Sequence, residues 1–378
     1  MQTGKQKRLN PRSKEFNMTP SQNKVLISDP RLETLKENLS FILHNNAPRK
    51  QYSRTKAWEK KKDIIHWGQR KLFLSELWFL TKYGHLATCV VYAGSAPGTH
   101  IPFLAQLFPK HKFILIDPSN FDLKDLQDDK TNVKERITVR QEYFTDEIAT
   151  QLAQEHQGNI LFVSDIRTAD PHEQDAELVE IMVYRDNMKQ KDWINIMKPK
   201  KSLLKFRCPY PDRQNGKENL RMFKGEIYIQ PYAAPTSTET RLVPDDSLEE
   251  IEYDNVKYEE QLFYHNHVTR RATYQQPIEG GEGFNQTWDL SAEIVILYDF
   301  ITKFPEHYAN LPIFERIKKI SYELSRNITQ TSRTLATPMV APERRRHFNH
   351  KDHTSFYPDL RQELTEVELR QLQRENQE

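Results

Sequence analysis

Apolar runs alternate with amphipathic stretches through the middle of the chain. The run "ATCVVYAG" is followed by the amphipathic "THIPFLAQLF", and then by the apolar "KFILID". Uninterrupted apolar runs of this length are typical of strands that are buried on both faces. We predict further strands in "RITVRQEYF", "NILFVSD" and "KSLLKFRCP", and a helix in "ELVEIMVYRDNMKQKDWINIM". The alternation predicts an α/β fold with a mostly parallel central sheet and helices on both faces.

Helical spacing continues on both sides of these strands. A helix is predicted from Asp29-Pro30 to the break at Ala47-Pro48, because apolar residues recur there at helical intervals. These residues are Leu32, Leu35, Leu39, Ile42 and Leu43. A second helix is predicted from about Ile64 to Tyr83, with Gly84 as its C-cap glycine.

The second half of the predicted domain differs from the first. Residues 226–242 are expected to form antiparallel strands near the sheet edge. Residues 294–304 and 312–328 have helical periodicity and are expected to close the domain.

Both ends of the chain are polar. We expect residues 1–28 to be disordered, within a basic extension that reaches residue 48 and contains one helix. The central domain is then 49–330, and residues 331–378 form a polar C-terminal extension. One amphipathic helix is predicted in that extension from Leu360, Leu364, Val367 and Leu372. The nearby His347, His350 and His353 have no acidic or thiol partners, so no metal site is predicted.

Composition restricts the class of protein. No run of about 18 apolar residues occurs, so no membrane span is expected. The two cysteines, Cys89 and Cys208, form no disulfide or zinc framework, and the first residues lack the apolar core of a secretory signal. We therefore expect a protein that is not secreted. The first 70 residues carry an excess of basic residues, which indicates either a polyanionic partner or a solvated tail.

The loop in "VVYAGSAPGTH" follows a predicted buried strand. Gly94 and Gly98 stand four residues apart, which matches neither the dinucleotide fingerprint G-x-G-x-x-G nor a P-loop. A nicotinamide dehydrogenase is therefore improbable. The next strand ends at Asp117, where a carboxylate can bind ribose hydroxyls. An adenosine-type cofactor such as S-adenosylmethionine fits this pattern, while a helix-capping aspartate before Pro118 is the alternative.

Three charged residues interrupt apolar patterns. Lys71 lies on the apolar stripe of its helix, Asp165 ends a strand, and Lys205 lies inside one. Each has an ordinary structural explanation, such as a lysine that reaches solvent or an aspartate that caps a helix. Together they would place two lysines and a carboxylate beside the glycine loop, where such a cluster can shift the pKa of a lysine.

Five blocks of sequence resemble one family. The blocks "GQRKLFLSELWFL", "VVYAGSAPGTHIPFL", "ILFVSDIR", "LLKFRCPYPD" and "TSTETRLV" are similar to the poxvirus-type cap-specific mRNA 2′-O-methyltransferases, over about residues 50–325. In poxviruses that protein is also the small processivity subunit of the poly(A) polymerase. The resemblance implies a Rossmann-like class I methyltransferase fold, S-adenosylmethionine as cofactor, and no required metal. It implies capped mRNA and a poly(A) polymerase catalytic subunit as partners, in the host cytoplasm.

The resemblance also assigns residues to roles. The catalytic tetrad would be Lys71, Asp165, Lys205 and Glu239. Lys205 would be the base for the ribose hydroxyl or would stabilise the alkoxide, and Lys71 would add a nearby positive charge. The cofactor would be bound by Gln69, Tyr92, Gly94, Gly98, Asp117, Phe144 and Asp165. The family has an arginine two residues after the strand-end acid, where this chain has Ser119.

The cap pocket of the family sandwiches a methylated guanine between two aromatic rings. Tyr52 and Tyr210 match these rings, and Asp212 and Glu259 match the residues that hydrogen-bond the guanine edge. Three arginines next to tetrad members, Arg167, Arg207 and Arg241, would hold the RNA backbone. Two alternatives stay open: a non-catalytic RNA-binding polymerase subunit, and a 2′-O-methyltransferase that acts on uncapped RNA.

Overall fold

A computed structural model describes residues 28–53, 67–123, 125–126, 131–169, 176–213, 218–272 and 287–329. The predictions for residues 1–27, for the C-terminal histidines and for the C-terminal amphipathic helix lie outside the described residues. No helix within these ranges is both long enough and apolar enough to cross a membrane.

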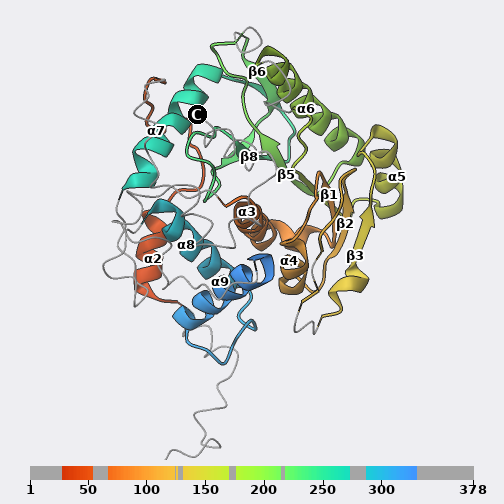
Figure 1. Cartoon of the computed structure of the whole chain (residues 1–378), viewed down its shortest axis with the longest axis vertical. Coiled ribbons are helices and arrows are strands. Elements are labelled where there is room, and N and C mark those ends of the chain that lie inside the picture. Colours follow the sequence, from red (N-terminus) through yellow and green to blue (C-terminus); the bar gives the residue numbers. More distant parts are fainter. Residues whose placement is uncertain are drawn as a thin grey trace, which may run out of the picture.

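A seven-stranded sheet occupies the centre of the described chain, in the order β3-β2-β1-β4-β5-β8-β7 (Figure 1). Its strands are β1 (Cys89–Ala93), β2 (Lys112–Ile116), β3 (Ile137–Arg140), β4 (Ile160–Ser164), β5 (Lys201–Phe206), β7 (Gly225–Tyr228) and β8 (Thr240–Pro244). β3, β2, β1, β4 and β5 are parallel, whereas β8 is antiparallel to both of its neighbours. The predicted α/β fold with a mostly parallel sheet and an antiparallel edge is therefore confirmed.

Helices cover both faces of this sheet (Figure 1). α3 (Gly68–Tyr83) and α4 (Ile101–Leu107) lie on one side with α8 (Trp288–Lys303) and α9 (Ile313–Thr329). α5 (Asp146–His156) packs against α6 (Ala176–Met197) on the other side. The strands β1 and β4 are buried along their whole length, as the apolar runs predicted.

The N-terminal helix is shorter than predicted. α2 spans Pro30–Glu37, and Asp29 caps it by accepting a hydrogen bond from the main-chain N–H of Arg31 at 2.9 Å. The following apolar residues are extended, because they bond to β7: the N–H of Leu43 donates to the carbonyl of Ile227 at 2.8 Å. Apolar residues at helical spacing can also be buried from an extended segment, and pairing with the sheet edge decided the outcome here. Leu32, Leu35, Leu39 and Leu43 all belong to the core.

Gly84 is the C-cap residue of α3, as predicted, but its backbone is right-handed rather than left-handed. Its φ is −58°, and the chain continues into a short 3₁₀ turn, Gly84–Leu86. The close approach of His111 explains the glycine: the ring Nε2 lies 2.8 Å from the carbonyl oxygen of Gly84, and a Cβ on Gly84 would lie 3.3 Å from that nitrogen.

Several elements were absent from the prediction. The helix α7 (Asn255–His267) and a separate two-stranded ribbon of β6 (Leu220–Phe223) and β9 (Glu250–Tyr253) extend the fold beyond the edge of the sheet. α7 carries buried polar residues among its apolar ones, which obscures its hydrophobic period.

Candidate functional site

The glycine loop and the loop after β4 meet at the carboxyl ends of the parallel strands. Gly94 has a φ of +76°, and a Cβ there would lie 2.7 Å from the main-chain nitrogen of Ile166. The N–H of Asp165 donates to the carbonyl of Ala93 at 2.9 Å. Only glycine permits this packing of the two loops, so Gly94 places the Asp165 carboxylate beside the loop.

Asp117 closes the other side of the glycine loop. Its Oδ2 accepts a hydrogen bond from the N–H of Ala96 at 3.2 Å, and its Oδ1 accepts one from the N–H of Ser119 at 2.8 Å. The described residues 117–123 contain no helix, so the helix-cap alternative for Asp117 is wrong. Ser119 contributes its main-chain N–H to this carboxylate at the position where the family has an arginine.

A buried hydrogen-bond network between α3, β1 and the start of α4 supports the glycine loop. Oε1 of Gln69 accepts from the Thr99 hydroxyl and lies 2.8 Å from Nδ1 of His100. Nε2 of His100 lies 2.9 Å from Oε2 of Glu76, and the Tyr92 hydroxyl donates to Oε1 of Glu76 at 2.7 Å. Burial, with the neighbouring Glu76 charge, raises the pKa of Tyr92 well above its usual value. Tyr92 therefore acts from inside the protein, as support for the loop.

Glu76 and His100 were not among the residues predicted for the site. The seven-residue spacing of Gln69 and Glu76 on one helix places both side chains on one face, which was the available signal. The pairing with His100 depends on the approach of α3 to the start of α4, which no local pattern reveals.

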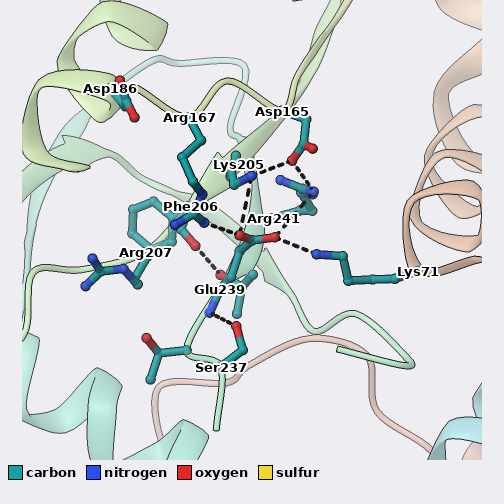
Figure 2. Close-up of polar contacts among 12 residues, drawn as sticks. Lys71, Asp165, Arg167, Asp186, Lys205, Phe206, Arg207, Ser237, Glu239 and Arg241 are labelled. Atoms are coloured by element: carbon teal, nitrogen blue, oxygen red, sulfur yellow. Dashed lines mark hydrogen bonds and ion pairs between the residues drawn. The ribbon is translucent and has the colours of Figure 1, made fainter. Parts of the chain in front are cut away.

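The four predicted catalytic side chains lie together (Figure 2). The ammonium of Lys205 is 3.0 Å from Oδ1 of Asp165 and 3.4 Å from Oε2 of Glu239. The ammonium of Lys71 donates to Oε1 of Glu239 at 2.7 Å. Lys205 comes from β5, Asp165 follows β4, and Glu239 precedes β8. Because β8 runs antiparallel to β5, the residues at the start of β8 lie at the same end of the sheet as the carboxyl ends of β4 and β5.

The charges of this cluster shift its pKa values in different directions. Burial lowers the pKa of Lys205, and the charges of Asp165 and Glu239 oppose that effect only in part. Burial would raise the pKa of Glu239, but the charges of Lys205 and Lys71 hold it well below its usual value. The arrangement therefore contains two ionised carboxylates and a lysine that gives up its proton more readily than an exposed one.

The three arginines differ in their exposure. The guanidinium of Arg241 is only 2% exposed and donates to Oδ1 of Asp165 at 2.6 Å, so it is part of the buried charge network. Arg167 bonds Glu239 with 38% of its side chain exposed, which leaves it available to RNA. Arg207 is buried and points away from Glu239 (Figure 2). The exposure of Arg167 is compatible with its predicted contact to the RNA backbone. Arg207 and Arg241 are buried and pair with Glu180 and Asp165 inside the protein.

The predicted cap residues lie on two parts of the fold. Tyr210 is half-buried, with its hydroxyl 3.3 Å from that of Thr238. Asp212, two residues further along the chain, is exposed, and its Oδ1 lies 3.7 Å from Nε of Arg213. Glu259 lies buried on α7, and the half-exposed Tyr52 ring packs edge-on against Phe263, with centroids 5.5 Å apart.

The donors and acceptors around the glycine loop fit an adenosine cofactor. Asp117 is half-buried and retains lone pairs for ribose hydroxyls. The buried Ser95 hydroxyl has no hydrogen-bond partner among the described residues. Phe144 offers apolar surface, with its ring 4.7 Å from that of Trp193. Gly98 has a φ of +67°, and a Cβ there would lie 3.0 Å from the carbonyl oxygen of Ser95, so glycine is needed for the tight fold of this loop. No cluster of three metal-ligating side chains occurs among the residues that the structure describes.

Comparison with known proteins identifies relatives of this arrangement. The chain is 30% identical over 233 residues to the cap-specific mRNA (nucleoside-2′-O-)-methyltransferase of Myxoma virus (strain Lausanne), over 56% of this chain and 64% of that protein. It is 33% identical over 219 residues to the protein of the same name from Fowlpox virus (strain NVSL), over 53% of this chain and 66% of that protein. The matches thus span just under two thirds of the length of these relatives.

A family model extends the relationship further along the chain. The model described as poly(A) polymerase regulatory subunit matches residues 39–333. This range includes the central sheet and every residue of the charge network, so the relationship expected from the five sequence blocks is confirmed. The chain belongs to the poly(A) polymerase regulatory subunit family.

Proposed function

We propose that the chain methylates the ribose 2′-hydroxyl of the first transcribed nucleotide of capped mRNA. One observation carries this proposal: the Lys205 ammonium lies between two carboxylates at the end of the sheet where the glycine loop begins. A lysine with a lowered pKa in this position can accept a proton from a ribose hydroxyl. The names of the viral relatives support the substrate.

Each member of the tetrad has a distinct task. Lys205 accepts the hydroxyl proton at Nζ as the oxygen attacks. Asp165 and Glu239 orient that nitrogen, and Lys71 fixes Glu239 from the opposite side. S-adenosylmethionine, when bound, supplies the methyl group. Gly94, Gly98, Asp117 and Ser95 would hold it, with the Gln69 amide behind the loop. Positioning of the two reactants supplies much of the rate.

The test is methyl transfer to RNA with a methylated cap, an unmethylated cap or no cap. We expect the methylated cap to be the best substrate. Lys205→Ala should reduce transfer by at least about a hundredfold, because general-base catalysis contributes about 10²–10⁴. Lys201→Ala is the matched control, since Lys201 begins the same strand and pairs with Asp246 at 2.7 Å. Full activity of Lys205→Ala would exclude the mechanism, and equal activity on all RNAs would favour an enzyme for uncapped RNA.

The family relationship supports a second role, in binding a poly(A) polymerase catalytic subunit. This role does not require the tetrad, so Lys205→Ala should still bind the polymerase and lengthen its products. The measurement is co-purification together with the length of the poly(A) product. A wild-type chain that stimulates the polymerase but transfers no methyl group would instead favour the non-catalytic alternative.

A further inference from the structure

The guanidinium of Arg207 lies over one face of the Tyr210 ring. Its centre is 4.3 Å from the ring centroid, and the arginine side chain is 8% exposed. The guanidinium bonds Glu180 of α6 through two nitrogens, at 2.8 and 2.9 Å. Glu180 is 2% exposed and also accepts the main-chain N–H of Tyr210 at 2.9 Å. One buried carboxylate thus binds both the backbone of the tyrosine and the cation under its ring.

The electrostatics of this stack matter for a base on the outer face of the ring. A cation on one face of an aromatic ring occupies its negative potential and repels a second cation on the other face. A stacked base would lie about 8 Å from the guanidinium, which is comparable with the Debye length of about 8–10 Å at physiological salt. Glu180 cancels the guanidinium charge at close range, so the ring remains attractive to a positively charged base.

We propose that Glu180 sets the preference of the Tyr210 ring for a cationic base, such as a guanine methylated at N7, over a neutral one. This inference rests on the proposed function, because it takes Tyr210 as a ring that stacks on the cap. Glu180 touches no substrate and acts through Arg207 and Tyr210, as a positioning and charge-balancing residue.

The experiment measures equilibrium binding of the full chain to two cap dinucleotides, one methylated at N7 and one unmethylated. The measured quantity is the ratio of the two affinities. Glu180→Gln leaves the guanidinium charge without its counter-ion and should lower this ratio, by at most about thirtyfold, the effect of a fully unbalanced unit charge about 8 Å away at an effective dielectric constant of about 20. Arg207→Met leaves the Glu180 carboxylate, which still accepts the main-chain N–H of Tyr210, and should raise the ratio at a pH where that carboxyl group is ionised. The double variant carries neither the Glu180 nor the Arg207 charge beside the Tyr210 ring, and it should restore the wild-type ratio of affinities.

The two single variants should change the affinity ratio in opposite directions, which distinguishes the proposed role of Glu180 from a purely structural one. Damage to the pocket would weaken binding of both dinucleotides in both single variants and leave their ratio unchanged, and that result would overturn the proposal. A buried unpaired charge is costly, so either single variant can fail to fold; the comparison of the other single variant with the double variant then decides, and equal ratios would overturn the proposal. A wild-type chain that binds both dinucleotides equally would overturn the proposed cap recognition as well.

Discussion

The chemistry of Lys205 depends on the charges of its neighbours. Arg167 lies close enough to lower the pKa of Lys205, and it also neutralises part of the charge on Glu239. Removing this positive charge makes the charged form of Lys205 more favourable. The pKa of Lys205 in Arg167→Gln should therefore be higher than in the wild type.

The pKa of Lys205 should determine how the rate of methyl transfer depends on pH. Methyl transfer requires neutral Lys205, so the rate should rise with pH to a plateau, and Arg167→Gln should shift that rise to higher pH. The measurement is kcat/KM for capped RNA across the pH range. Arg140→Gln is the control, because Arg140 bonds Glu142 at 2.6 Å on the outermost strand, β3. A shift to lower pH in Arg167→Gln would contradict Lys205 as the base.

At the scale of elements, the junction of β1 with the loop after β4 depends on one glycine. An alanine at position 94 would have both a positive φ and a Cβ 2.7 Å from the main-chain nitrogen of Ile166. We expect Gly94→Ala to lower the free energy of unfolding by more than the ~1–2 kcal/mol that left-handed backbone alone costs a non-glycine residue.

Gly158 provides the matched comparison for this prediction. It has a φ of +73°, but its Cβ would meet only the end of the Lys200 side chain, at 3.9 Å. Gly158→Ala should therefore incur the backbone cost alone, and the difference between the two variants measures the steric contact. Denaturant unfolding of both variants gives the two values. Equal destabilisation would show that the two loops do not pack as described.

The elements differ in how well the sequence predicted them. β1, β2, β4 and β5 were predicted because burial on both faces produces unbroken apolar runs. The segment after Glu37 was predicted as helix but lies against β7, since apolar spacing alone does not distinguish a helix from a strand paired at a sheet edge. Gly84 was predicted as the C-cap of α3 and occupies that position, but a right-handed cap does not require glycine, and the close approach of His111 explains the residue.

At the scale of the whole molecule, the sequence indicated the position of the site better than its internal contacts. Residues at the ends of parallel strands meet at one edge, so Gly94, Asp117 and Asp165 could be placed together from topology. The burial of Arg207 and Arg241, and the hydrogen-bond partner of the buried Tyr92, could not be predicted, because Glu180, Asp165 and Glu76 come from other elements. Their roles in substrate binding remain predictions.

The antiparallel strand β8 has a consequence for how preparations of this protein can be judged. Lys205 pairs directly with Arg241, and Glu239 lies two residues further along on the same face. A slip of one residue between β5 and β8 would turn Glu239 and Arg241 to the opposite face while it left most of the sheet intact. Such molecules would pass as folded by circular dichroism, yet be inactive. The fraction of molecules that turn over in an active-site titration would therefore report strand register, as a built-in check on correct assembly.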